Sequence, residues 1–346
     1  MDFTPTEEQD AARELAARIF ADLSTHERLA AAGTGTDVEL WKALCAAGLP
    51  GAVEEIGLLG LVLLLEEQGR TTAQVPLAAS CVHGVLAVSR HGTPEQRARL
   101  LPALRAGSAV ATGAFPERGT VRAEGDGRLT GTVAWVPWLR DATHVLVPDT
   151  ARSLWLVRAA DAEITAVETT APWAAARLTL DCTPAERLGN GSPGTGAYED
   201  VLAVARIAFA GLQAGVCAGS LARAVAYTSV REQFGRPLAT KQAVQLRAAD
   251  AYMDTEAIRV TAYEAAWRCD ERLPCAEQAL VAGWWASEAG KRVVHTGQHL
   301  HGGLGADIDH PVHRHFLWGR QLDAYLGCGA QLLEELGLLL AKEKVQ

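Results

Sequence analysis

Several features that would mark a particular class of protein are missing from this sequence. The formal net charge is −9, so the chain lacks the basic footprint that nucleic-acid binding requires. The seven cysteines include no Cys-x-x-Cys pair, and most of them lie within apolar helical patterns. An odd number of scattered cysteines favours reduced thiols in a cytosolic protein. We therefore expect no nucleic-acid partner and a cytoplasmic location.

Signals for secretion or membrane insertion are also missing. The first residues, Met-Asp-Phe-Thr-Pro-Thr-Glu-Glu, contain no basic region followed by an apolar run, so no signal peptide is expected. The longest apolar segment runs from Ile56 to Leu65, contains two glycines and is followed by two glutamates. A helix needs about 20 residues to span a bilayer, so we expect no membrane insertion.

What is present is the composition of a large globular protein. The chain has 346 residues, of which 49% are hydrophobic and 21% are charged. This composition is typical of a soluble protein with a large core, and the length predicts two or three domains.

The first third of the chain has helical periodicity. A helix is predicted from Leu58 to Glu67, closed by Gly69. Another is predicted to begin at Pro94, with Thr93 as its cap, because proline is favoured at the first helical position.

The pattern then changes to short segments separated by glycine, proline and aspartate, as strands are. A Gly-Asp-Gly turn at 125–127 predicts a hairpin. The Gly-rich segment 189–194 formally matches a dinucleotide fingerprint, but it has no surrounding strand–helix unit and contains a proline, so we interpret it as a linker. The predicted strands are 109–115, 120–124, 129–135, 144–147 and 154–157.

Long amphipathic helices return after residue 198 and predict a four-helix bundle. They are expected near 198–229, 238–271, 276–300 and 311–342. The predicted fold class is therefore α+β, in three parts. These are an N-terminal helical domain at 1–107, a middle β-domain at 108–197 and a C-terminal four-helix bundle at 198–346.

Arg231, Phe234 and Gln242 lie where one bundle helix ends, a Gly-Arg-Pro turn intervenes and the next helix begins. An arginine beside an aromatic residue can pair with a phosphate and stack on a flat ring. The alternative is that Arg231 is a solvated charge at a helix end and that Phe234 fills part of the core.

The pattern Arg-x-x-Phe-Gly-x-Pro-Leu-x-x-x-Gln-x-Val that begins at Arg231 resembles the signature of the acyl-CoA dehydrogenases, flavoproteins that desaturate acyl thioesters. The resemblance extends over nearly the whole chain, because the order of helical, β and bundle domains is that of the family. It implies FAD as cofactor, an acyl-CoA substrate, and electron-transfer flavoprotein or a similar acceptor. In the family this arginine and phenylalanine hold the FAD of a neighbouring subunit.

A second segment that resembles the family is Gln-His-Leu-His-Gly-Gly-Leu-Gly at 298–305. Gly302 and Gly303 allow backbone amides to approach a diphosphate closely, although a plain helix cap explains them as well. His299 stands where many relatives have glutamine. The residues expected to contact the cofactor are Arg231, Phe234, Gln242, His299, Gly302 and Gly303.

Histidine is concentrated in the same region. His295 and His299 share one helix face, which is the geometry of a zinc pair, but no glutamate accompanies them in the metalloprotease arrangement. Roles in the polar core or at an interface are favoured, and no metal is expected. The run from Asp309 to His315 also resembles a branch of the family that actinobacteria use on steroid side chains.

Desaturation of a thioester needs a carboxylate to remove the α proton, while the flavin accepts hydride from the β carbon. The resemblance implies two places for that glutamate, and here they are assigned to Ala205 and Gly327, neither of which can take a proton. We therefore expect no catalytic base in this chain. Glu256 and Asp323 are the alternative carboxylates, and Glu256 is expected to pair with Arg259 on the helix surface.

The β-domain departs from the family too, because Ala111 to Thr120 retains only fragments of the loop whose hydroxyl and amides meet the flavin ring. Taken together, the sequence resembles the non-base subunit of a heteromeric α2β2 acyl-CoA dehydrogenase of bacterial steroid degradation. A homologous partner chain would then supply the glutamate. Two alternatives are a homo-oligomeric dehydrogenase with a relocated base and a non-catalytic scaffold that has lost its flavin.

Overall fold

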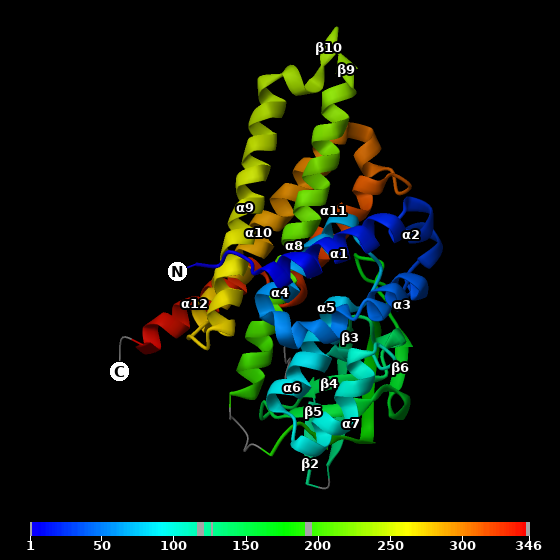
Figure 1. Cartoon of the computed structure of the whole chain (residues 1–346), viewed down its shortest axis with the longest axis vertical. Coiled ribbons are helices and arrows are strands. Elements are labelled where there is room, and N and C mark those ends of the chain that lie inside the picture. The colour runs from blue at the N-terminus through cyan, green and yellow to red at the C-terminus, as the bar shows by residue number, and fades with distance from the viewer. Residues whose placement is uncertain (1, 116–120, 126, 191–195, 344–346) are drawn as a thin grey trace. The chain divides into compact units, whose positions relative to one another are not determined.

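The computed structural model describes residues 2–115, 121–125, 127–190 and 196–343. The chain forms two compact units. One comprises Met1–Glu7, Val62–Ala73 and Arg206–Gln346, and the other comprises Glu8–Leu61 and Gln74–Ala205. The expected fold class is confirmed, with N-terminal helices, β-sheets and C-terminal helices in that order (Figure 1). The domain boundaries at 107 and 197 stay predictions.

The N-terminal region is helical, as expected. Thr93 forms a complete capping box with Gln96, which confirms the predicted start of the helix at Pro94. The helix predicted at 58–67 is longer at both ends, and it kinks at Gly57, whose φ is +74°. The elements are α1 (Glu7–Leu23), α2 (His26–Ala32), α3 (Val38–Ala46), α4 (Leu49–Thr71), α5 (Leu77–Ser80), the π-helical turn η1 (Cys81–Leu86), α6 (Ala87–His91) and α7 (Pro94–Arg105).

Gly69 does not close helix α4, contrary to the prediction. The helix continues to Thr71, and Gly69 is a packing residue instead. A Cβ atom on Gly69 would lie 2.3 Å from the Leu212 carbonyl oxygen, so only glycine permits this close approach of two helices.

Two four-stranded sheets form the β region. Their orders are β1-β4-β5-β8 and β2-β3-β7-β6, and only β1 and β4 pair in parallel among the described strands. Apolar side chains from both sheets, such as Leu129, Val145 and Leu178, form one core. The strands are β1 (Ala111–Gly113), β2 (Val121–Glu124), β3 (Arg128–Val136), β4 (His144–Pro148), β5 (Leu154–Arg158), β6 (Glu163–Ala166), β7 (Ala176–Pro184) and β8 (Glu186–Arg187).

The predicted strands agree with β1 to β5, whereas β6, β7 and β8 were not predicted. The hairpin of β2 and β3 is confirmed by the pairing of Glu124 with Arg128. Part of the expected turn at 125–127 and most of the expected linker at 189–194 lie outside the described residues.

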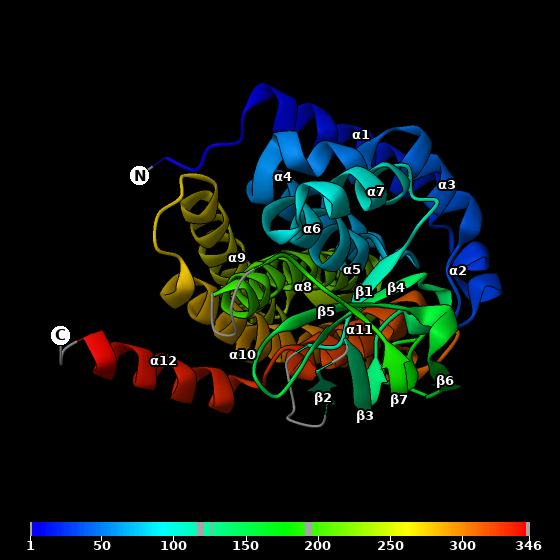
Figure 2. The same cartoon turned by 90° about the horizontal axis from the view of Figure 1, so that it is seen from below.

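The C-terminal region is a helical bundle in which α8, α9 and α10 lie side by side (Figures 1 and 2). The segment predicted as one helix at 311–342 forms two helices, because the helical structure ends at Tyr325 and resumes at Gly329. The helices are α8 (Ala197–Val230), α9 (Gln242–Asp270), α10 (Ala276–His301), α11 (Pro311–Tyr325) and α12 (Gly329–Glu343).

Helix α8 is long and apolar enough to cross a membrane by length and composition, and so are α3 and α4 if that bent pair is counted as one span. However, 89% of the most apolar window of α8 is buried within the protein. Buried core helices of globular proteins pass the same test, so these helices are weak grounds for a membrane span.

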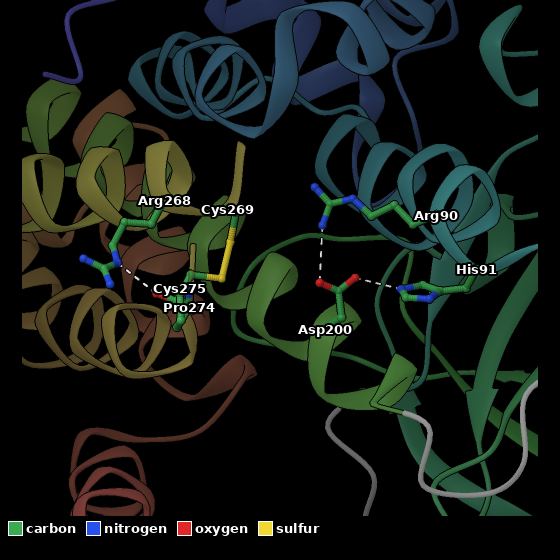
Figure 3. Close-up of a disulfide and its surroundings, with 7 residues drawn as sticks. All are labelled: Arg90, His91, Asp200, Arg268, Cys269, Pro274 and Cys275. Atoms are coloured by element: carbon green, nitrogen blue, oxygen red, sulfur yellow. Dashed lines mark hydrogen bonds and ion pairs between the residues drawn. A yellow bond between two sulfur atoms is a disulfide. The ribbon is translucent and has the colours of Figure 1, made fainter. Parts of the chain in front are cut away.

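One cysteine prediction is wrong. Cys269 and Cys275 form a disulfide across the turn between α9 and α10 (Figure 3), whereas Cys45, Cys81, Cys182, Cys217 and Cys328 are free thiols as expected. The two cysteines are six residues apart in sequence, and the antiparallel helices bring their Cα atoms to 5.8 Å. The same turn is held by Arg268, whose Nε donates to the Pro274 carbonyl at 2.9 Å.

In the unit that contains Gln74–Ala205, the Asp200 carboxylate in the first turn of α8 contacts the side chains of Arg90 and His91 at the end of α6 (Figure 3). The His91 Nε2 atom lies 2.7 Å from a carboxylate oxygen of Asp200. These contacts hold the first turn of α8 against the end of α6.

Candidate functional site

The turn after α8 forms an exposed arm. Two short strands, β9 (Glu232–Gln233) and β10 (Arg236–Pro237), make a tight hairpin at the end of α8 and α9 (Figure 1). At its tip the Phe234 side chain is 92% exposed, with the Lys241 ammonium 4.5 Å from the ring centroid. The alternative that Phe234 fills the core is therefore wrong, and its ring is available to a partner.

Arg231 and Gln242 lie at the base of this arm, and both side chains are exposed. The backbone of Arg231 is fixed by a hydrogen bond to the Tyr227 carbonyl and by another from the Leu238 amide, at 2.9 and 2.8 Å. Within the described part of the chain, no carboxylate pairs with the Arg231 guanidinium. A fixed arginine with open donors fits an external phosphate.

The second glycine-rich segment lies at the end of α10. Gly302 has a φ of +62°, and its amide donates to the His299 carbonyl, so the helix-cap interpretation is confirmed for this residue. A Cβ atom on Gly302 or Gly303 would meet nothing within 4 Å, so the surface beside both glycines is open. The residues expected to bind FAD thus fit a flat, anionic cofactor, and they occupy two helix ends of one unit.

A groove of about 1000 Å³ runs beside His299 between α9, α10 and α11. Asp254 binds Arg292 there through two hydrogen bonds of 2.9 and 2.7 Å, so this carboxylate is already paired. The groove is lined by Arg247, Asp250, Ala251, Met253, Asp254, Lys291, Arg292, His295, Thr296, His299 and Arg320.

The concentrated histidines have packing and capping roles. His295 meets the Phe316 ring edge-on at 4.9 Å, and burial lowers its pKa. His310 caps α11 by accepting from the Val312 amide, and His315 is buried with its ring nitrogens near the Arg70 and Pro311 carbonyls. No cluster of three or more possible metal ligands occurs among the described histidine, cysteine, aspartate and glutamate side chains.

Neither expected base position carries a carboxylate. Ala205 is fully buried on α8. Gly327 has a φ of +118°, a conformation that favours glycine. The assignment of the second base position to Gly327 stays a prediction; the residue before it, Leu326, is buried and has no group that could take a proton.

Arg206 connects these two positions. It follows Ala205 directly, is 6% exposed and hydrogen-bonds the Leu326 carbonyl at 3.4 Å. Its charge is matched by Glu335 on α12, at 2.7 Å. Glu335 was not predicted from the sequence, although an arginine within an apolar helix indicates a charged partner.

The alternative carboxylates are engaged elsewhere. Glu256 pairs with Arg259, as predicted, and Arg259 also binds the buried Glu66 at 2.7 Å. Asp323 accepts from the Ser287 hydroxyl at 2.8 Å and contacts Arg320 at 3.2 Å. Both carboxylates therefore already have hydrogen-bond and ion-pair partners within this chain.

We expected the loop from Ala111 to Thr120 to correspond to the flavin-contacting loop of the family. In its described part, the Thr112 and Phe115 side chains contact other residues of this chain. The Thr112 hydroxyl is buried and donates to the Pro137 carbonyl at 2.5 Å. The Phe115 ring stacks between His83 and Tyr198, at centroid distances of 5.3 and 5.5 Å. Residues 116–120 lie outside the described range.

Two family models match the chain. The model of the acyl-CoA dehydrogenase N-terminal domain matches residues 6–108, and that of the C-terminal domain matches residues 193–337. The chain belongs to the acyl-CoA dehydrogenase family. FAD is the cofactor of this family, and the exposed residues at the ends of α8 and α10 suit it.

Its relatives include one enzyme that is named for steroids. The chain is 35% identical to the acyl-CoA dehydrogenase FadE27 of Mycobacterium tuberculosis, over 99% of each chain. A variant of the Tcur3481–Tcur3483 steroid ACAD is similar at 43% identity with a TM-score of 0.92, over 98% of this chain and 99% of that one. The ChsE4–ChsE5 complex of M. tuberculosis is similar at 34% identity with a TM-score of 0.91, over 99% of each chain.

Proposed function

We propose that this protein is the non-base subunit of a heteromeric, FAD-dependent acyl-CoA dehydrogenase. A homologous partner chain would supply the catalytic glutamate in an α2β2 assembly. The substrate would be a CoA ester of a steroid side chain, and electron-transfer flavoprotein or a similar protein would accept the electrons.

One contrast carries this proposal. The arm with Arg231 and Phe234 is exposed and open to a partner, whereas the two positions expected for the base hold Ala205 and Gly327, which have no carboxylate. A homomeric enzyme with a relocated base is disfavoured, because Glu256 and Asp323 are both held by arginines. A scaffold without flavin would have no use for an unpaired arginine on a fixed backbone.

The names of the relatives support the proposed substrate class and assembly. Both similar solved structures are named as pairs of chains, and one is named as a steroid enzyme. The cytoplasmic location proposed from the composition agrees with a soluble CoA-dependent enzyme.

In this assembly the chain binds and orients rather than transfers a proton. The Arg231 guanidinium would donate to the FAD diphosphate of the partner, and the Phe234 ring would cover a flat face of the cofactor. His299 and the Gly302–Gly303 turn would complete the contact from α10, with the Gly303 amide as the donor, because the Gly302 amide already caps the helix. When bound, FAD would be the acceptor of the hydride from the β carbon, and the glutamate of the partner would be the acceptor of the α proton.

The test is co-purification with the homologous partner, followed by measurement of FAD content and dehydrogenase activity. The isolated chain should show no turnover above background with a steroid acyl-CoA and an artificial electron acceptor. In the complex, Arg231→Ala should weaken FAD binding by roughly one to two decades, the value of a charge-assisted phosphate contact.

Arg236→Ala is the matched control, because Arg236 is an exposed arginine on the same hairpin. It should leave FAD content unchanged. Turnover by the isolated chain at ordinary enzyme rates, about 1–10³ s⁻¹, would contradict the proposal.

A further inference from the structure

Three aromatic side chains meet where the two halves of the candidate FAD surface come together. The His301 ring stacks on the Tyr227 ring, with centroids 4.8 Å apart and an interplanar angle of 20°. The His310 ring also contacts His301, and the centroids of these two rings are 5.0 Å apart. We call Tyr227, His301 and His310 the aromatic stack.

Each member of the aromatic stack belongs to a different helix end. Tyr227 lies in the last turn of α8, one helical turn before Arg231, and the Arg231 amide donates to its carbonyl. His301 is the last residue of α10 and directly precedes Gly302. His310 caps the beginning of α11.

His301 is held in one orientation. It is 4% exposed, and its Nδ1 atom lies 2.7 Å from the Gly297 carbonyl oxygen. A carbonyl oxygen only accepts, so Nδ1 carries the proton that forms this hydrogen bond. The ring is therefore fixed to its own helix while its face lies on Tyr227.

We propose that His301 is a positioning residue for the cofactor. Through its stack on Tyr227 it sets the distance between Arg231, which follows α8, and the Gly302–Gly303 turn, which follows α10, so that both can contact one FAD diphosphate. Contacts made from two separate helix ends bind one ligand tightly only when the ends are held in the productive geometry beforehand. This inference rests on the proposed function.

The test measures FAD rebinding to the apo form of the complex with the partner chain, by flavin fluorescence. His301→Ala should raise the FAD Kd roughly threefold to tenfold, the range that corresponds to an aromatic pair. His301→Phe keeps the ring stack but removes the hydrogen bond to Gly297, and it should restore the Kd to within about twofold of the wild type. Tyr227→Leu removes the stack from the other side and should match His301→Ala.

Two controls separate positioning from folding. His295→Ala removes another histidine–aromatic contact of α10, that with Phe316, and should leave the FAD Kd unchanged. The melting temperature of each apo complex shows whether the bundle is intact. A wild-type FAD Kd for both His301→Ala and Tyr227→Leu, or failure of His301→Phe to restore binding, would overturn the inference.

Arg231→Ala distinguishes this failure from that of the proposed function. If Arg231→Ala weakens FAD binding and the stack variants do not, the aromatic stack has no positioning role while the proposed function stands. If Arg231→Ala itself binds FAD normally, the proposed cofactor role fails and the inference fails with it.

Discussion

Gly290 on α10 lies directly against Gln213 on α8, since a Cβ atom on Gly290 would come within 1.9 Å of the Gln213 Nε2 atom. The same nitrogen donates to the Ala286 and Gly319 carbonyls, each at 3.2 Å. The same contact recurs seven residues earlier on both helices, between Gly283 and Arg206, and seven residues later, between Gly297 and Ser220. Because residue numbers rise together along α8 and α10, the two helices run parallel in a fixed register.

We expect Gly290→Ala to destabilise the bundle by about 1–3 kcal/mol, because the methyl group would displace the buried Gln213 amide. Gly283→Ala is the matched control. The nearest atom to its Cβ would be 3.4 Å away, so the gain in helix propensity should make it neutral or stabilising by up to about 1 kcal/mol. Urea unfolding measures both variants, and equal effects would show that the Gln213 contact is not tight.

A buried carboxylate anchors α4 to α9. The Glu66 side chain is 4% exposed and binds Arg70 at 2.6 Å, Arg259 at 2.7 Å and the Tyr263 hydroxyl at 2.8 Å. Burial raises the pKa of Glu66, but the hydrogen bond and charge of Arg259 outweigh this effect and the net shift is downward. Glu66 is therefore ionised in the folded protein.

Glu66→Gln should lower the free energy of unfolding by about 1.5–3 kcal/mol, because it removes the charged acceptor of Arg259 and Arg70 while Glu256 still pairs with Arg259. The control is Asp161→Asn, which removes an exposed pair with Arg158 and should cost about 0–1 kcal/mol. Chemical denaturation compares the two. A loss below about 1 kcal/mol for Glu66→Gln would mean that the buried network contributes no more than a surface pair.

The contrast between these contacts shows what a sequence can predict. The start of α7 at Pro94 was predictable, because Thr93 and Gln96 form the cap within four residues. The Glu66–Arg259 pair was not, because its partners are 193 residues apart and nothing local marks them. For the same reason the sequence identified the arm at Arg231 but not the stack of Tyr227 on His301.

The errors have local physical causes. The last helix was predicted unbroken, since periodicity does not reveal that Gly327 takes a φ of +118°. Gly69 was interpreted as a helix stop, whereas its role is close packing against α8. The Cys269–Cys275 disulfide was missed, because the sequence does not show that the α9–α10 turn brings the two residues together.

Acid should destabilise the protein through a buried histidine. Burial lowers the pKa of His315 to about 4, with the Arg223 and Arg314 charges acting in the same direction and the carbonyl hydrogen bonds opposing them. The unfolded chain takes up this proton near pH 6.5 and the folded chain only near pH 4. Stability is therefore complete above pH 6.5 and falls as the pH drops toward 4, by at most about 1.4 kcal/mol per pH unit.

His315→Gln removes this proton while keeping a donor for the Arg70 carbonyl. The free energy of unfolding of the variant should depend less on pH between 6.5 and 4 than that of the wild type. His83, whose pKa burial also lowers to about 4, remains in both proteins and supplies a common background slope. Identical pH profiles would show that His315 is not neutral in the folded protein.

The location of the catalytic base is tested by removing carboxylates from both chains of the complex. Substitution of glutamine for the bundle-helix glutamate of the partner should lower the rate by about 10²–10⁴, the usual cost of losing a general base.

Glu256→Gln and Asp323→Asn in this chain should leave turnover nearly unchanged. A base must be within reach of the α proton, whereas Glu256 is paired with Arg259 and Asp323 is held by Ser287 and Arg320. FAD content is measured alongside turnover, so that a loss of cofactor is not mistaken for a loss of base. A drop of 10²–10⁴ for either variant with FAD still bound would place the base in this chain and favour a homomeric enzyme.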